Sequence, residues 1–336
     1  MLDRMRGLPW WKIAGLALVL LLPLAVSNRY YLHVLNLVGI YSLVVIGLNL
    51  LSGYTGQVSM GQAGFFGVGA YVSALLMMRL NVPFVVAVSA ATLVSALCGV
   101  VIGIPAMRLS GPYLVMATVG FGEIMRLIMV NWVPVTMGAA GLTGIPLPSF
   151  LGMQISSERG FYYLICAVLY LATLEALRLS NSKVGRTFLA IREDDLAAGA
   201  MGVPTDRYKV AAFAISAAYA GIAGALYGSF AGVASPDNFT FDVSVLLLCM
   251  SVVGGNRTIY GALVGALALT VFSEALRFLQ GYRLIVYGAI LLATVIFMPQ
   301  GLSGLAPAVA QVFRRMHFPG HKGQNGVARD KGETCR

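Results

Sequence analysis

The sequence predicts an all-α, polytopic integral membrane protein with about ten transmembrane helices. Of its 336 residues, 58% are hydrophobic and only 11% are charged, and the mean hydropathy is +0.82. A soluble domain carries about 25% charged residues, so the composition excludes a typical cytosolic enzyme, a disordered chain and a disulfide scaffold. The apolar runs are continuous rather than alternating, which favours helices over a membrane β-barrel.

Ten apolar runs approach the roughly 20 residues that a helical membrane span needs. In chain order the predicted helices are Trp11–Val26, Tyr31–Leu51, Gly61–Met78, Phe84–Ile104, Tyr113–Val130, Phe161–Leu177, Val210–Val233, Phe241–Val253, Gly261–Ala275 and Leu284–Phe297. They predict one transmembrane domain over residues 1–317. The Gly-rich, basic segment 318–336 is expected to be a disordered cytoplasmic tail.

The first run has two interpretations. Basic residues precede it, and Ala25–Ser27 resembles a cleavage site, which is typical of a secretory signal. Pro23 and the aromatic pair Trp10–Trp11 instead favour a retained, anchored helix. The sequence does not decide between a cleaved signal and a retained span.

The basic residues set the expected orientation. The formal net charge is +10, and the Lys and Arg residues cluster in the loop 178–209 and near the two ends of the chain. With ten spans these segments share one side, so both termini are expected in the cytoplasm. This pattern fits an inner-membrane protein in contact with lipid and does not suggest nucleic acid binding. The opposite loop, 131–160, is rich in Gly, Pro and Ser and is expected to carry a short surface or re-entrant helix.

No catalytic residues and no metal site are predicted. The sequence contains no G-x-x-x-x-G-K-[ST] phosphate-binding loop, no H-E-x-x-H motif and no nucleophile elbow. The three histidines are scattered, and no pair of the four cysteines has metal-ligand spacing. This chain is therefore not expected to be an enzyme or to bind a cofactor itself.

Two charged pairs fall within or beside apolar runs. Glu123 and Arg126, and likewise Glu274 and Arg277, are three residues apart and can share a helix face. They could line a substrate path or gate, or simply neutralise each other. The scarcity of other ionisable residues in the spans weighs against a stand-alone ion-coupled transporter.

The 39 glycines include three G-x-x-x-G patterns that predict close helix contacts. They begin at Gly99, Gly228 and Gly261.

Two polar stretches interrupt the apolar runs. The first is Ser52–Gly67, where hydroxyls, amides and glycines lie between two spans, and the second is Arg108–Glu123. Non-helical backbone with polar side chains occurs at membrane depth only where it is buried in protein or lines a cavity. The residues predicted for a translocation path or gate are Tyr54, Thr55, Gly56, Gln57, Ser59, Gln62, Thr118 and Glu123.

A third stretch, Gly185–Val203, predicts one or two short interfacial helices. Apolar residues such as Phe188 and Ile191 supply its buried faces, acids at positions 193–195 suit the start of a helix, and Gly202 suits a stop. It could be a solvated connector or a docking element for a partner.

These stretches resemble the membrane subunits of bacterial branched-chain amino acid ABC importers, and the resemblance spans roughly Gly47 to Gly304. The matching segments are Gly53–Gly61, Phe65–Tyr71, Gly185–Arg186, Ala190–Glu193, Ala198–Val203, Lys209–Phe213, Ala220–Leu226, Ser235–Pro236, Gly254–Gly255, Gly261, Gly265–Ala266 and Met298–Leu302.

The resemblance implies an ABC permease fold and a set of partners. These are a second, related permease, two ATP-binding subunits that carry ATP-Mg, and a periplasmic substrate-binding protein. It also implies that the loop 178–209 couples the permease to an ATPase. The implied coupling residues are Arg192, Glu193, Asp194, Asp195, Leu196, Ala197, Ala198 and Gly202.

The chain departs from the family pattern at two places. Ala197, Ala198 and Gly202 keep the A-A-x-x-x-G spacing of ABC coupling helices, but Leu196 replaces the acid before them. Asn256 and Arg257 follow Gly254-Gly255 where the family usually has another glycine, which predicts an added contact on the cytoplasmic side.

The cargo remains open between branched-chain amino acids and urea or short amides, because selection is expected in the binding protein. Whether the permease pair consists of identical or different chains is open as well.

Overall fold

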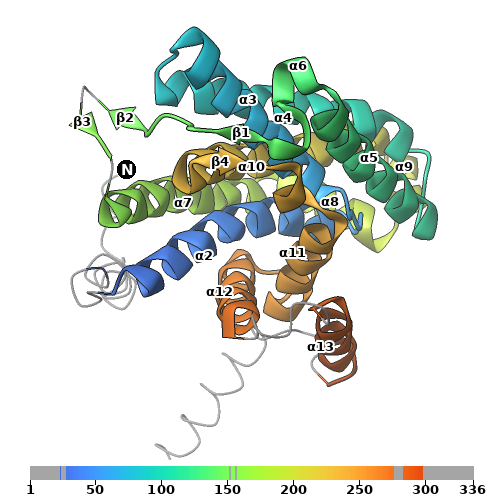
Figure 1. The fold of residues 1–336 in the computed structure, drawn as a ribbon. Coiled ribbons are helices and arrows are strands. Elements are labelled where there is room, and N and C mark those ends of the chain that lie inside the picture. The colour runs from blue at the N-terminus through green and yellow to red at the C-terminus, as the bar shows by residue number, and fades with distance from the viewer. Residues whose placement is uncertain (1–22, 24–27, 151–152, 156, 276–282, 298–336) are drawn as a thin grey trace, which may run out of the picture.

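The computed structural model describes residue 23 and residues 28–150, 153–155, 157–275 and 283–297 (Figure 1). The long helices are α2 (Arg29–Leu48), α3 (Gln62–Leu80), α4 (Phe84–Ala106), α5 (Pro112–Asn131), α7 (Glu158–Ser180), α10 (Thr205–Ala231), α11 (Phe241–Gly254), α12 (Ile259–Ala275) and α13 (Arg283–Phe297). The short helices are η2 (Asn49–Tyr54), α6 (Val133–Thr136), η3 (Gly138–Ala140), α8 (Lys183–Glu193), α9 (Asp195–Ala200) and η4 (Pro236–Phe239).

The nine long helices confirm the last nine predicted apolar runs. Six of the described helices are long and apolar enough to cross a membrane, counting α2 with η2 as one, and α11, α12 and α13 are shorter apolar helices. Apart from residue 23, the predicted run Trp11–Val26 lies outside the described residues, and so does the predicted tail 318–336. The count of ten is therefore approximate.

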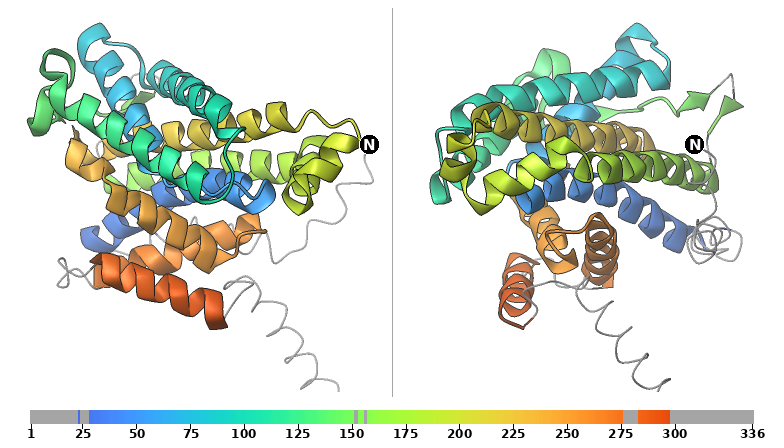
Figure 2. Two further views of the ribbon diagram at one scale, coloured as in Figure 1. Left: turned by 90° about the vertical axis from the view of Figure 1, so that its right-hand side faces the viewer. Right: turned by 180° about the vertical axis from the view of Figure 1, so that it is seen from behind.

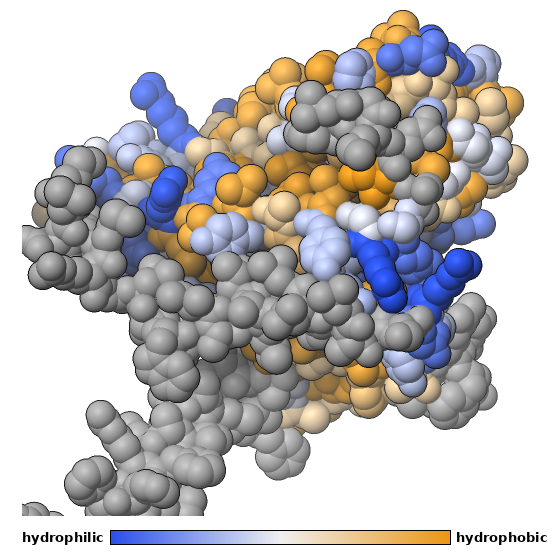
Figure 3. All heavy atoms as spheres, turned by 90° about the vertical axis from the view of Figure 1, so that its left-hand side faces the viewer, coloured by the Kyte–Doolittle hydropathy of each residue, from blue (hydrophilic) through white to orange (hydrophobic). Residues whose placement is uncertain are grey.

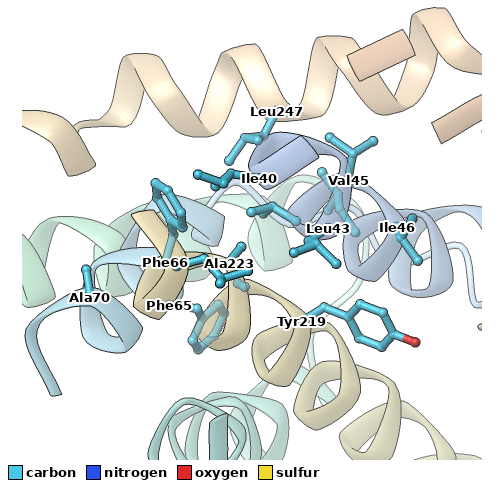
Figure 4. Packing of buried hydrophobic residues seen from close by; sticks show 14 of the residues in the cluster. Ile40, Leu43, Val45, Ile46, Phe65, Phe66, Ala70, Tyr219, Ala223 and Leu247 are labelled. Atoms are coloured by element: carbon cyan, nitrogen blue, oxygen red, sulfur yellow. The ribbon is translucent and has the colours of Figure 1, made fainter. Parts of the chain in front are cut away.

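The helices are arranged in layers. α3, α4 and α5 lie on one side of α2, α7 and α10, and α11, α12 and α13 lie on the other (Figures 1 and 2). The core lies where α2, α3, α10 and α11 meet, and close-packed side chains such as Phe66, Ala223 and Leu247 fill it (Figure 4).

Glycines bring the backbones of the central helices together. A methyl group on Gly69 of α3 would lie 2.3 Å from the carbonyl oxygen of Gly221 of α10. A methyl group on Gly99 of α4 would lie 2.8 Å from the carbonyl oxygen of Phe213, also on α10. The predicted G-x-x-x-G contacts are thus present on α4, and on α12 against Gly254. The third pattern is wrong in part, because a methyl group added at Gly232 would have no atom within 4 Å, and this glycine instead ends α10 with a φ of +67°.

The described residues also contain four short strands of two residues each, which the all-helical prediction did not include. β1 (Leu142–Thr143) pairs with β4 (Val233–Ala234), and β2 (Ser149–Phe150) pairs with β3 (Met153–Gln154). They lie in or beside the loops at one end of the bundle. The short helices α6 and η3 confirm the expected helix in the 131–160 loop.

The surface has the polarity expected of a membrane-embedded bundle. On the face in Figure 3, hydrophobic residues form the middle, and hydrophilic residues gather toward its two opposite edges. Exposed apolar side chains such as Leu93, Leu97 and Val101 follow the outer face of α4. Such a band needs lipid or another subunit to cover it.

Candidate coupling and translocation site

The loop 178–209 forms the two short helices that the sequence predicted, α8 and α9. The Ser182 hydroxyl caps α8 by accepting a hydrogen bond from the Gly185 N–H. The Asp194 carboxylate caps α9 by accepting from the N–H groups of Leu196 (2.9 Å) and Ala197 (3.0 Å). These caps satisfy N–H groups that a helix start leaves unpaired.

α8 is fixed to the bundle. Phe188 and Ile191 are buried, and Phe188 packs in a cluster with Leu51 and Phe213. Lys209 at the start of α10 forms an ion pair with Asp195 on α9. α9 is therefore tied to a rigid helix on each side.

α9 also presents apolar residues outward. Leu196 is 86% exposed and Met201, just past its end, is 85% exposed. Ala197 is exposed as well, whereas Ala198 is 7% exposed and packs inward. Gly202 ends this segment with a φ of +85° and faces open space.

The end of α8 contacts two other segments that the sequence singled out. The Arg192 guanidinium donates a hydrogen bond to the carbonyl of Gly53 at the end of η2. Glu193 forms an ion pair with Arg257 at 3.2 Å. We name this meeting point, made by Gly53, Arg192, Glu193, Asn256 and Arg257, the coupling junction.

Burial lowers the pKa of Arg192, and the nearby positive charge of Arg257 lowers it further, while Glu193 opposes the shift. The guanidinium is thus partly desolvated. A partly desolvated cation needs acceptors, and the Gly53 carbonyl is one.

A π-helix carries α2 into the polar turn Tyr54–Gln62. Asn49 donates hydrogen bonds to the carbonyls of Gly255 and Thr258, both at 3.2 Å. Ser52 donates to the Asn256 side chain at 3.0 Å. π-helical turns of this kind often mark functional sites. The expected extra contact at Asn256–Arg257 is confirmed, whereas Asn49 was missed, although an asparagine in an apolar run was a signal.

The polar turn is mostly buried and ends at the start of α3. The Met60 N–H donates to the Thr118 hydroxyl (3.1 Å), and the Ala63 N–H donates to the Ser244 hydroxyl (3.0 Å). Gln62 donates to the Ser216 hydroxyl at 2.8 Å. Groups on α5, α10 and α11 therefore meet the N-terminal end of α3, and sequence reasoning missed Ser216 and Ser244.

The predicted path residues divide into two groups. Thr55, Gln57, Ser59, Gln62 and Thr118 are buried, whereas Gly56 is exposed and Tyr54 is partly buried. The Oε1 atoms of Gln57 and Gln62 are buried and have no hydrogen-bond partner among the described residues.

Glu123 forms the expected ion pair with Arg126 at 2.7 Å. It also borders a cavity of about 20 Å³ with Met60 and Ser244, which has room for a water and not for an amino acid. Of the second expected pair, Glu274 accepts a hydrogen bond from the Tyr30 hydroxyl (2.9 Å), and Arg277 lies outside the described residues.

The helical membrane bundle, its buried polar turn and its outward-facing short helix define a polytopic membrane permease. The family described as "Branched-chain amino acid transport system / permease component" matches residues 30–295, and the chain belongs to it.

Two relatives bear this out. The high-affinity branched-chain amino acid transport system permease protein LivM of Escherichia coli (strain K12) is 34% identical over 85% of this chain and 74% of its own length. LivH of Salmonella typhimurium, a permease protein of the same kind of system, is 29% identical over 81% of this chain and 93% of its own length. No solved structure matches.

Proposed function

We propose that this chain is one of two membrane subunits of an ATP-driven importer that passes branched-chain amino acids into the cytoplasm. Membership of the permease family supports this function. Similarity to both LivM and LivH supports pairing with a second, related permease. One observation carries the mechanism: the exposed helix α9 directly follows α8, and Arg192 near the end of α8 bonds to Gly53, just before the polar turn of the bundle.

Two ATP-binding subunits, which hold ATP-Mg, would dock at α9. Leu196, Ala197 and Met201 offer an apolar surface that water covers poorly. Docking would bury these side chains in a groove of the ATPase. Leu196 stands where the general pattern of ABC coupling helices has an acid, so the proposed contact is apolar at its centre. The nearby acids have other roles: Asp194 caps α9, and Asp195 forms an ion pair with Lys209.

Closure of the ATPases would move α9, and the coupling junction would carry that movement inward. Arg192 is hydrogen-bonded to Gly53, at the end of η2, and Glu193 is ion-paired with Arg257, at the turn before α12, so both segments would move with α8. The first contact adjoins the polar turn, and the second reaches it through Asn256, which accepts a hydrogen bond from Ser52 of η2. The two states of the permease would then differ at the polar turn, as alternating access requires.

The start of α3 is the best-supported part of the path. A helix N-terminus carries a partial positive charge, and this one is buried beside hydroxyls of Thr118 and Ser244. In this state Ser59, Thr118 and Ser244 accept from N–H groups at this end. An anionic group such as an amino acid carboxylate would replace these hydroxyls when the polar turn moves. The unpaired amide oxygens of Gln57 and Gln62 add acceptors at the same level.

The orientation follows from the same proposal. The end of the bundle with α8 and α9 faces the cytoplasm, both termini are cytoplasmic, and a periplasmic binding protein delivers cargo at the opposite end of an inner-membrane complex. The clustering of Lys and Arg in the 178–209 segment supports this orientation.

The proposal is tested by copurification from the native host in mild detergent. We expect the tagged chain to bring down a second permease and an ATPase, and the variant Leu196→Ser with Met201→Ser to lose the ATPase and keep the permease. Leu80→Ser, at an apolar position that is 66% exposed at the far end of α3, is the matched control. If the wild-type chain copurifies with neither subunit and still drives uptake after reconstitution, the ABC mechanism is wrong.

Uptake by the reconstituted complex identifies the cargo. Leucine should compete with labelled isoleucine, and urea should not. Competition by urea alone would replace the amino acid by an amide cargo, and collapse of uptake by an ionophore at constant ATP would indicate an ion-coupled transporter.

A further inference from the structure

A cleft of about 420 Å³ lies at the end of the bundle opposite to the coupling junction. It is bordered by the middle of α2, the end of α10, η4, the start of α11, the end of α12 and α13. Small-molecule sites in proteins have volumes of roughly 300–1,000 Å³. The cleft is thus large enough for an amino acid, unlike the 20 Å³ cavity at Glu123.

Three carboxylates border the cleft: Asp237, Asp242 and Glu274. Within the described part of the chain, neither Asp237 nor Asp242 forms an ion pair. Arg126 interacts electrostatically with Asp237, so Asp242 is the more informative of the two. Among the described residues no group of His, Cys, Asp and Glu could hold a metal ion, which favours an organic cation.

A buried hydroxyl is the second, independent sign of a ligand. Thr270 borders the same cleft and is 5% exposed, yet its Oγ1 has no hydrogen-bond partner within the described part of the chain. Leaving a buried hydroxyl unpaired is costly, and native proteins rarely do so without a reason. A ligand that offers a donor in the cleft would satisfy this oxygen.

The remaining walls combine apolar and aromatic side chains with the polar side chains of Asn238, Thr240 and Ser273. Leu37 and Leu246 contribute aliphatic surface, and Tyr41, Tyr227 and Tyr287 contribute rings. Aromatic faces attract ammonium groups, and aliphatic groups accept an apolar side chain. No lysine or arginine borders the cleft within the described residues, so its only charged side chains are carboxylates, which favour a cation over an anion.

We propose that this cleft binds a primary ammonium group attached to an apolar body, and that its natural ligand is the incoming amino acid. The identity of that ligand rests on the proposed function. An ammonium group has three donors, and the Asp242 carboxylate and the Thr270 hydroxyl supply acceptors for it. The cleft is a receiving site on this subunit, ahead of the polar turn.

The test measures binding to the purified permease complex without its binding protein, by saturation-transfer NMR titration. The probes are leucine, 3-methylbutylamine, which is leucine without its carboxylate, and 4-methylpentanoate, which lacks the ammonium group. We expect the first two to bind and the third not to bind. Asp242→Asn should weaken both about tenfold, because a charge-assisted bond is lost. The control Glu175→Gln, an exposed acid on α7, should bind like the wild type.

Equal binding of 4-methylpentanoate, or unchanged amine binding by Asp242→Asn, overturns the proposal. Asp242 also lies in the first turn of α11, where a carboxylate favours the helix. Thr270→Val separates a ligand role from a structural one. Removing an unpaired hydroxyl should leave the melting temperature unchanged or higher, while 3-methylbutylamine binds at least about threefold more weakly. A lower melting temperature with unchanged binding would show that the hydroxyl is structural, and would overturn its proposed role in binding the ligand.

ATP-driven uptake with the binding protein present separates this proposal from the proposed function. If Asp242→Asn binds and takes up leucine like the wild type, the proposed site in the cleft is wrong and the proposed importer function is unaffected. If the wild type takes up no branched-chain amino acid but binds 3-methylbutylamine through Asp242, the cargo assignment fails and the ammonium site stands.

Discussion

The contact among α3, α4 and α10 and the coupling junction are held by different kinds of interaction. In the first, glycines allow backbones to touch, and a single added methyl group at Gly224 would lie 2.0 Å from the carbonyl oxygen of Phe66. In the second, charged side chains reach across to backbone carbonyls or to each other, as Arg192 does to Gly53. Close backbone packing has one arrangement, because neither side can rotate away. Polar contacts made by long side chains can be broken and remade.

This difference predicts which part of the permease moves. The α3–α4–α10 unit should behave as a rigid body, and the coupling junction should be where α8 and α9 transmit a change to the polar turn. Rigid units joined by a few adjustable contacts are typical of conformational switches.

The largest expected effect comes from the rigid unit. Gly224→Ala should prevent correct packing, because the methyl group would meet the backbone of α3, and we expect a cost of about 3 kcal/mol or more. Gly120→Ala is the matched control, since nothing lies near that position on α5. It should be neutral or stabilise by about 0.5–1 kcal/mol. Yield of folded protein and melting temperature in detergent measure both, and equal behaviour of the two variants would contradict the rigid packing.

The packed helices were predicted from the sequence more completely than the contacts of the coupling junction. Lipid demands continuous apolar helices, so α2 to α5, α7 and α10 to α13 followed from hydropathy within a few residues. α10 begins at Thr205 rather than the predicted Val210, because an apolar window stops at the charged first turn although the helix continues. The π-helical end of α2 had no signal in composition.

Contacts between distant segments were beyond prediction from one sequence. Arg192 and Gly53 are 139 residues apart, and each was singled out separately, one for coupling and one beside the path. Only the fold brings them together. The hydroxyls of Ser216 and Ser244 were missed for the same reason, since each is a single small polar residue in an apolar helix.

The coupling junction gives the second prediction. The variant Arg192→Gln should still dock an ATPase at α9. It lacks the charged group that donates a hydrogen bond to the Gly53 carbonyl. A hydrogen bond to a charged group contributes about 1.5–3 kcal/mol, so we expect leucine uptake per ATP hydrolysed to fall at least about tenfold. Arg186→Gln is the control, because Arg186 is exposed and its guanidinium donates to the carbonyl of the nearby Asn181, away from the polar turn. If both variants keep the wild-type ratio of uptake to hydrolysis, the link from α9 to the polar turn runs elsewhere.

The smallest effect is expected at the outer part of the same junction. The side chains of Glu193 and Arg257 are 71% and 64% exposed, and exposed ion pairs contribute roughly 0–1 kcal/mol. Glu193→Arg or Arg257→Glu alone should therefore lower uptake by no more than about fivefold at low salt. The two changes combined should restore it, because the pair is re-formed with reversed charges, and higher ionic strength should weaken the penalty of each single variant. A double variant no better than the worse single variant would mean that Arg257 acts on a partner subunit rather than on Glu193. The junction would then depend on Arg192 alone for its connection to the polar turn.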